Sequence, residues 1–189
     1  IYGAGDGVCS ADPRVVPGAR HLPELDLATL QEMSESGAKV LCAQAIEWAR
    51  RKGIVLHARS TFDPRRETVV HAGTDRARPT ARAVALEAKA LLISVRSPID
   101  EVVAKLAVAV LSYKDLVSSS ESMSFVLPYG NLPSAAAAEE RIVHALPGAT
   151  IEAGVVVVSV VGDGLAGTAE PLRSFLDALR DVGAAPRRV

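Results

Sequence analysis

The segment ALLISVRSPID, residues 90–100, passes from a strand into a helix and decides how the second half of the chain folds. Its first six residues are mostly apolar, which is typical of a buried strand. Ser97 then stands where a helix N-cap is expected, with Pro98 at the first helical position and Asp100 at the third. The segment therefore predicts a strand over residues 90–95 and a helix that begins at Pro98.

The elements expected around this segment follow the order β-α-β-β-α-β. The helix after Pro98 is amphipathic, because its apolar residues recur every three or four positions. Further strands are expected over residues 115–118, 122–127, 149–152 and 155–161, and a second helix over residues 134–146. This order predicts a ferredoxin-like unit, in which two helices cover one face of an antiparallel sheet.

A similar pattern returns near the C-terminal end. Val158-Ser159-Val160 resembles Ile93-Ser94-Val95, and an amphipathic helix follows it from about Thr168 to Gly183. The repeat predicts a second ferredoxin-like unit, of which residues 154–189 supply only the beginning. A partial sheet leaves an open edge, so we expect it to borrow strands from elsewhere in the chain or from a partner.

The first half predicts an α/β arrangement. Residues 1–26 are rich in Gly, Pro and Asp and indicate loops around a short strand. Helices are expected over residues 27–35 and 38–52, strands over 54–56 and 68–71, and a polar connection over 72–82. The predicted domains are residues 1–72, a linker over 73–84, a first ferredoxin-like unit over 85–153 and a partial second one over 154–189.

Composition excludes several classes of function. With 49 % hydrophobic residues and a net charge of −1, the chain suits a packed domain and lacks the basic excess of a nucleic-acid-binding surface. It contains no run of about 18 apolar residues that would span a membrane. Cys9 and Cys42 have no metal-ligand spacing, and the four histidines have no triad spacing. We therefore expect a cytoplasmic protein without a metal site.

Two segments of the first half carry a family resemblance. Residues 5–17, GDGVCSADPRVVP, resemble the nucleotide-loop motif of aspartate kinases, T-D-V-D-G-V-Y-T-A-D-P-R-I-V-P. Residues 37–41, GAKVL, and residues 59–62, RSTF, resemble the G-A-K-V-L-H-P and R-S-S-F motifs of the same family. The order and the spacing agree, so residues 1–72 are expected to be the end of an amino-acid-kinase domain.

This resemblance implies a nucleotide site. A kinase holds a polyphosphate with fixed cations and backbone N–H groups. Arg14 and Lys39, the latter expected at a helix start, would contact ATP, which the family uses with magnesium, and Asp12 and Cys9 lie in the same motif. The chain departs from the motif at Gly3 and Ala4, where the family has Thr-Asp, and at Cys9 and Cys42, where it has Tyr and His.

The family's N-terminal K-F-G-G strand, which supplies the catalytic lysine, does not occur in the sequence. The aspartate-binding half is also missing, so we expect no catalytic residue here and no phosphoryl transfer by this chain alone. The chain begins at Ile1 without a methionine or a signal peptide, which indicates a piece of a longer protein or a processed product.

The second half resembles the ACT regulatory domains of aspartate kinases. Residues 115–121, DLVSSSE, resemble the segment V-D-L-I-T-T-S-E that lines the effector site in lysine-sensitive members. The resemblance implies that Asp115 and Glu121, with Ser120 beside them, accept the ammonium group of an amino acid. Backbone N–H groups near Ser97 would receive its carboxylate. The alternative is that these residues only turn the chain between two strands.

Three functions remain open. The first is part of an aspartate kinase, which makes 4-phospho-L-aspartate for lysine, threonine and methionine synthesis. Such a chain would sense lysine or threonine and form a dimer through its ACT units, or bind a partner chain that carries the catalytic half. The second is a degenerate, non-catalytic binding or scaffold protein. The third is another amino acid kinase, which the ACT-like repeat disfavours.

Overall fold

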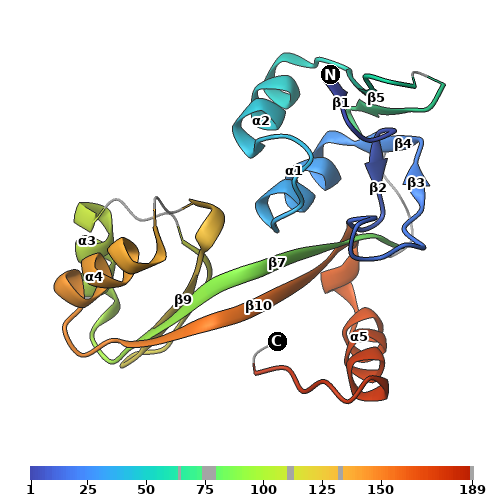
Figure 1. Ribbon diagram of the computed structural model, residues 1–189. Helices are drawn as coiled ribbons and strands as arrows, with labels where there is room; N and C mark the ends of the chain where they lie inside the picture. The colour runs from blue at the N-terminus through green and yellow to red at the C-terminus, as the bar shows by residue number, and fades with distance from the viewer. Residues whose placement is uncertain (64, 74–79, 110–112, 132–133, 188–189) are drawn as a thin grey trace. The chain divides into compact units, whose positions relative to one another are not determined.

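The computed structural model describes residues 1–63, 65–73, 80–109, 113–131 and 134–187. The chain divides into two compact units (Figure 1). The first unit contains Ile1–Leu86 and Val158–Val189, and the second contains Glu87–Val157. Two long strands, β7 (Thr80–Val95) and β10 (Thr150–Asp163), contribute residues to both units.

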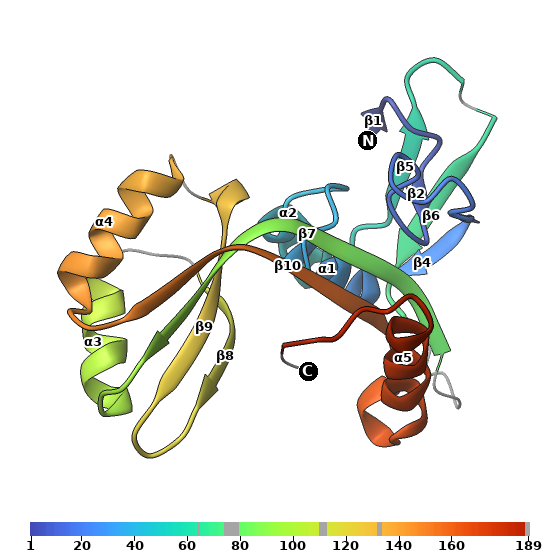
Figure 2. The ribbon, with the colours of Figure 1, turned by 60° about the horizontal axis from the view of Figure 1, so that its bottom comes forward.

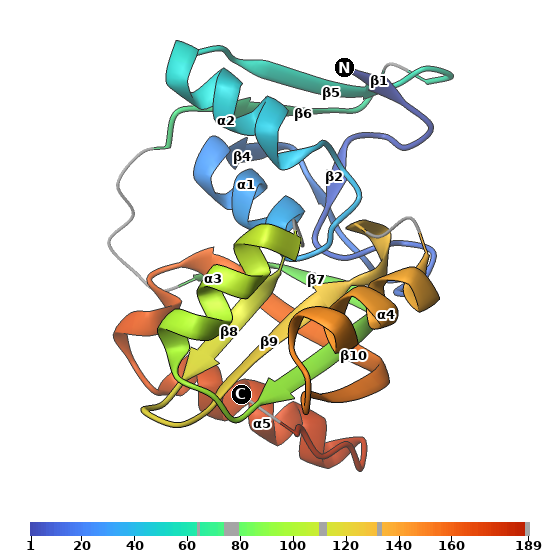
Figure 3. The same cartoon turned by 90° about the vertical axis from the view of Figure 1, so that its left-hand side faces the viewer.

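The second unit is a four-stranded sheet in the order β10-β7-β9-β8. Strand β9 (Met123–Pro128) pairs antiparallel with β7 on one side and with β8 (Lys114–Ser118) on the other. Helices α3 (Ile99–Ala109) and α4 (Ala135–Ala145) cover one face of the sheet (Figure 3). The element order confirms the predicted ferredoxin-like arrangement.

The core of the second unit lies between this sheet and its two helices. Alternate residues of β7 and β9 point toward the helices, because successive side chains of a strand face opposite sides. Val102 and Leu106 of α3 meet them one helical turn apart. Phe125 is completely buried at the centre. The other buried members of this core are Leu91, Ile93, Val95, Met123, Leu127, Ile142 and Leu146.

The first unit contains a four-stranded sheet in the order β1-β5-β6-β4. Its strands are β1 (Tyr2–Gly3), β5 (Leu56–Ser60), β6 (Glu67–His71) and β4 (Glu24–Asp26). Strand β1 runs parallel to β5, and β5 runs antiparallel to β6 (Figure 2). A small hairpin, β2 (Val8–Cys9) with β3 (His21–Leu22), stands apart from this sheet.

Helices α1 (Leu27–Glu35) and α2 (Ala43–Lys52) complete the N-terminal part of this unit. The Asp26 carboxylate caps α1 by accepting the Thr29 N–H at 2.8 Å, and α1 has the predicted bounds. Helix α2 ends at Gly53 with φ 62°, and the Ile54 N–H donates to the Ala49 carbonyl oxygen at 2.9 Å. This Schellman-type ending needs the left-handed conformation that glycine adopts without strain.

The second helix begins later than the sequence predicts, at Ala43 instead of Ala38. Residues 38–42 are still engaged with the end of α1, since the Ala38 N–H donates to the Met33 carbonyl oxygen at 2.9 Å. Lys39 therefore lies in the connection between the helices, and the prediction that it occupies a helix start is wrong. The N-cap of α2 is Cys42, whose side chain makes no capping hydrogen bond.

Two strand predictions are also wrong in their bounds. The strands expected over residues 149–152 and 155–161 are one strand, β10, which continues past Gly154 although that residue has φ 73°. Residues 80–84, expected as linker, belong to β7. Alanine has low strand propensity, so the buried Ala83 and Ala85 give little sequence signal. Residues 74–79 of the expected linker lie outside the described residues.

The remaining elements deviate by one to a few residues. Helix α3 begins at Ile99 instead of Pro98, and the strand expected over residues 54–56 is β5, Leu56–Ser60. After β10 come a 3-10 turn, Leu165–Gly167, and the amphipathic helix α5 (Glu170–Asp181), in which no residue is fully buried. Among the described residues, no helix has the length and apolar character needed to cross a bilayer.

Candidate functional site

The Asp-Pro-Arg turn that follows β2 is held by its own side chains. Asp12 accepts the backbone N–H of Arg14 at 2.9 Å. Its two carboxylate oxygens also accept Arg14 Nε at 3.0 Å and Nη2 at 2.7 Å, a bidentate ion pair. The Asp12 carbonyl oxygen accepts the N–H groups of Val15 and Val16. The turn is therefore rigid, and the Arg14 charge is balanced by a carboxylate on the same turn.

Lys39 belongs to the same cluster. Hydrogen bonds from Arg14 are the main reason that the pKa of Asp12 is lowered to about 2, and the charge of the Lys39 ammonium contributes to the same lowering. Of the causes that act on this pKa, the charge of Lys39 is the smallest. The side chains of Arg14 and Lys39 are exposed. The structure thus pairs two of the predicted nucleotide-site residues, Asp12 and Arg14, and the charge of Lys39 acts on the same carboxylate.

Cys9, the fourth predicted residue of this site, lies on β2 opposite His21 of β3. Burial raises the pKa of the Cys9 thiol, and the negative charge of Asp6 raises it further. The thiol is therefore neutral at pH 7 and is a poor nucleophile and a poor metal ligand. Its position on the hairpin suits packing beside a ligand better than a nucleophilic or metal-binding role.

The ion pair between Asp12 and Arg14 predicts the pH at which the Asp12 carboxylate titrates. We expect the Asp12 carboxylate to titrate near pH 2, as followed by NMR of its side-chain carbon. Because the folded pKa lies below the unfolded one, stability from this group is present above the unfolded pKa and is lost as the pH falls toward 2. Arg14→Gln should return the value toward the ordinary pKa of aspartate.

Arg65→Gln is the matched control, because Arg65 makes the same kind of pair with Asp63 instead. It should leave the titration of Asp12 unchanged. An Asp12 titration that does not respond to Arg14→Gln would show that another cation holds the carboxylate.

The sequence analysis missed Arg65, which lies in the loop at the carboxyl ends of β1 and β5. These two strands are parallel, and the Thr61 N–H donates to the Gly3 carbonyl oxygen at 2.8 Å, so the loops that follow them share one edge. Arg65 in the second loop pairs with Asp63, and the charge of Asp6 in the first loop raises its pKa further. The available signal was a second Asp-Pro-Arg, residues 63–65.

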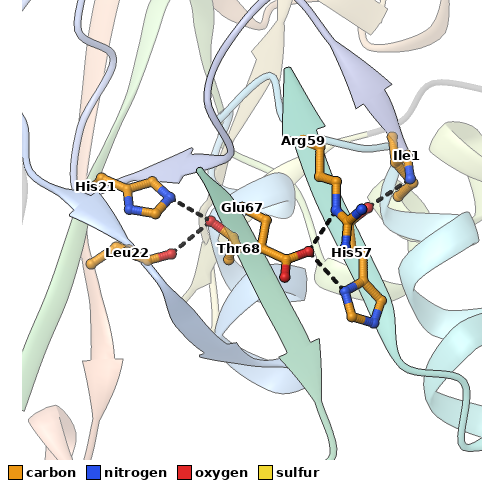
Figure 4. Close-up of polar contacts among 7 residues, drawn as sticks. All are labelled: Ile1, His21, Leu22, His57, Arg59, Glu67 and Thr68. Carbon is orange, nitrogen blue, oxygen red and sulfur yellow. Dashed lines mark hydrogen bonds and ion pairs between the residues drawn. The ribbon is translucent and has the colours of Figure 1, made fainter. Parts of the chain in front are cut away.

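Thr68 fastens the hairpin that carries Cys9 to the sheet (Figure 4). Its hydroxyl accepts the Val8 N–H at 2.8 Å and donates to the Leu22 carbonyl oxygen at 2.6 Å. The side chain is completely buried on β6. Nearby, Glu67 binds Arg59 at 2.6 Å and His57 at 3.0 Å (Figure 4). One buried hydroxyl therefore joins both strands of the hairpin to β6.

Three of the predicted effector residues gather at one end of the second unit's sheet. Val95, the last residue of β7, pairs with Met123, the first of β9. Ser97 follows the first of these strands, and Ser120 and Glu121 precede the second. The turn between β8 and β9 is closed by the Ser119 N–H, which donates to the Ser122 carbonyl oxygen at 2.8 Å. All three predicted residues therefore flank the same sheet end.

Asp115 lies elsewhere on the sheet. It follows Lys114, which pairs with Val126, whereas Ser118 at the other end of β8 pairs with Met123. At about 3.3 Å per residue, Asp115 is roughly 10 Å from the turn. It also has φ 51° within an irregularity of the strand. The structure thus separates Asp115 from the other three predicted effector residues.

A metal centre is not evident in the described ranges. No group of three or more His, Cys, Asp or Glu side chains there could hold an ion.

Comparison with known proteins gives a consistent set of relatives. Residues 1–60 match the model of the amino acid kinase family. The aspartokinase of Mycolicibacterium smegmatis is 43 % identical over 70 residues, which are 37 % of this chain and 17 % of that enzyme. The aspartokinase of Thermus thermophilus is 29 % identical over 97 % of this chain and 49 % of its own length. The chain spans at most about half of these relatives.

The solved structures that match this chain are also aspartokinases. E. coli aspartokinase III in complex with aspartate and ADP matches 93 % of this chain and 42 % of that one, with a TM-score of 0.82 and 26 % identity. The same enzyme in complex with lysine and aspartate matches with a TM-score of 0.73 and 25 % identity, over 91 % of this chain. An aspartate kinase of Clostridium acetobutylicum, at 20 % identity and a TM-score of 0.81, shares the fold over 99 % of this chain.

Proposed function

We propose that this chain, a relative of the aspartokinases over almost its whole length, is the C-terminal part of an aspartate kinase. Residues 1–72 would complete the kinase domain, residues 85–153 would form an amino-acid-binding ACT unit, and residues 154–189 would begin a second one. The whole enzyme would transfer the γ-phosphate of ATP to the side-chain carboxylate of L-aspartate. Its location would be the cytoplasm, where these substrates are found.

The observation that carries this proposal is the match to one enzyme family from the first strand to the last helix. The match includes E. coli aspartokinase III, whose complex contains aspartate and ADP. In this chain, Arg14 and Lys39 would be the cations that contact the nucleotide, and Asp12 would hold Arg14 in position. Cys9 would contribute packing. An exposed cation on the turn, Arg14, and one in the connection between the helices, Lys39, are suited to the phosphates of magnesium ATP.

The proposed regulatory ligand is an amino acid, lysine or threonine. E. coli aspartokinase III binds lysine in one of its structures. In this chain, the Glu121 carboxylate at the sheet end would accept an ammonium group, with Ser120 beside it. Backbone N–H groups after Ser97, where α3 begins, would receive the carboxylate. Asp115 lies roughly 10 Å farther along β8, so we propose no direct contact for it.

Calorimetry of lysine and threonine binding tests the sensor. We expect Glu121→Gln to weaken binding of the preferred amino acid at least tenfold, because it removes the charge that pairs with the ammonium group. Asp115→Asn is the matched control and should change affinity less than threefold. Absence of heat with either amino acid would refute the sensor, and equal losses in both variants would refute the assignment of Glu121.

A degenerate binding protein is the second candidate. The Asp12 carboxylate already engages the Arg14 guanidinium through two atoms, and Gly3 and Ala4 offer no polar side chain. Both features weaken a nucleotide site. Titration of ADP into the chain joined to a kinase N-terminal half distinguishes the candidates, since a degenerate protein would bind no ADP in that context. The proposed assembly is a dimer through the ACT units or a complex with a catalytic chain.

A further inference from the structure

A cavity of about 330 Å³ lies within the first unit, between the β2–β3 hairpin and the beginning of β7. Its lining residues are Arg20, His21 and Leu22 on one side and Thr80, Ala81 and Arg82 on the other. We call it the Arg20–Arg82 cavity. Sites for small molecules have volumes of roughly 300–1,000 Å³, so this cavity is large enough for a small ligand.

Hydrogen bonds hold the two walls of the cavity together. The Arg20 N–H donates to the Ser10 hydroxyl oxygen at 2.9 Å, and the Ser10 N–H donates to the Arg20 carbonyl oxygen at 2.8 Å. The Ser10 carbonyl oxygen in turn accepts the Val84 N–H of β7 at 2.8 Å. The His21 Nε2 atom lies 3.4 Å from the hydroxyl of the buried Thr68 (Figure 4). The cavity is therefore formed without a ligand, which lowers the entropy cost of binding one.

The two guanidinium groups of the cavity keep N–H donors for a ligand. The exposed Arg20 side chain makes no hydrogen bond or ion pair with another described residue. Arg82 Nε lies 3.7 Å from Asp163 Oδ2, which is too long for a hydrogen bond, and in the described part of the chain both buried atoms lack a hydrogen-bond partner. Arg14 and Arg65, in contrast, each donate directly to a carboxylate. A bound ion is one of the known reasons for a buried polar atom without a protein partner.

The charge of the lining determines the class of ligand. Two arginines line the cavity, and Asp163, the carboxylate that contacts one of them, balances one charge of the two. Guanidinium groups recognise the oxygens of phosphates and carboxylates through paired N–H donors. A cation would be repelled, and an uncharged ligand would match these donors less well. Leu22 and Ala81 add apolar surface beside the cations, which suits an anion with a small organic part.

We propose that the Arg20–Arg82 cavity binds a small organic anion. Its phosphate or carboxylate group accepts N–H donors from both guanidinium groups, and its apolar part lies against Leu22 and Ala81. Arg20 directly precedes β3 and Arg82 belongs to β7, so the anion joins the hairpin to that strand. This site is distinct from the proposed nucleotide contacts, since Arg14 and Lys39 do not line the cavity.

NMR titration of the whole isotope-labelled chain tests the proposal. The probes are inorganic phosphate and acetate, each added at constant ionic strength. The readout is the Nε–Hε signal of Arg82, which is assigned by its loss in the Arg82→Lys variant. We expect a saturable shift of this signal, and the anion that binds more tightly identifies the oxyanion group. Sodium chloride at the same ionic strength should cause no saturable shift, and an equal response to it would overturn the proposal.

Arg20→Gln should weaken binding of the preferred anion about tenfold, because it removes one of the two cations that hold it. Arg51→Gln is the matched control and should bind as the original chain does, since Arg51 is an exposed arginine of the same unit that pairs with Glu47. No saturable shift with either anion, or equal losses in both variants, would overturn the proposal. A shift that Arg14→Gln abolishes would place the anion at the Asp12 turn and would also overturn it.

Discussion

Replacing Gly162 by alanine is expected to lower the free energy of unfolding of the first unit by about 3 kcal/mol. Gly162 lies on β10 where the backbone of β7 passes close to it. A Cβ atom built there would collide with the Thr80 carbonyl oxygen, and it would lie 2.9 Å from the Ala81 Cα and 3.0 Å from the Arg82 nitrogen. All of these are main-chain atoms, so the collision can be relieved only if two paired strands move apart.

Gly167→Ala is the matched control, because a Cβ atom at Gly167 would meet nothing within 4 Å. Urea unfolding of both variants, followed by circular dichroism, gives the comparison. The control should lie within about 0.5 kcal/mol of the original chain. A Gly162→Ala variant as stable as the control would mean that β7 and β10 do not approach each other this closely in solution.

The same strands show what the sequence could not predict. Helix α1 and the elements of the second unit were predictable, because apolar periodicity and caps such as Ser134 are local signals. The extension of β7 to Thr80 depends on pairing with β10, a partner about 80 residues away. The ion pair of Arg82 with Asp163 could not be predicted for the same reason. The two side chains come within 3.7 Å only because Asp163, at the far end of β10, lies beside β7.

The candidate sites were also only partly predictable from the sequence. The motifs indicated Arg14 and Lys39, and the structure places both near Asp12. The pairing of Arg14 with Asp12 could not be predicted, because it depends on side-chain geometry within the turn. The separation of Asp115 from Glu121 depends on the path of β8 along β9, which includes an irregularity between Lys114 and Val117 that the sequence does not specify.

Thr68→Val is expected to lower stability by about 3 kcal/mol, although the two side chains have almost the same shape. The variant removes the hydroxyl that accepts the Val8 N–H and donates to the Leu22 carbonyl oxygen (Figure 4). Thr68 is completely buried, so water cannot replace the lost partner. Leaving the buried Val8 N–H unsatisfied costs about 1–3 kcal/mol, and the partly buried Leu22 carbonyl oxygen adds a smaller loss.

The loss should be concentrated in the β2–β3 hairpin, because Val8 and Leu22 are paired across it. Hydrogen exchange of the Val8 amide should accelerate more than that of Val70, which lies on the same strand as Thr68. Thr68→Ser keeps the hydroxyl and should retain most of the protection, whereas Thr61→Val, at an exposed position, should change neither stability nor exchange. If Thr68→Val slowed or left unchanged the exchange at Val8, the hydroxyl would not be what positions the hairpin. In that case the turn carrying Asp12 and Arg14 would depend on the packing of Val8 against the first unit's core instead.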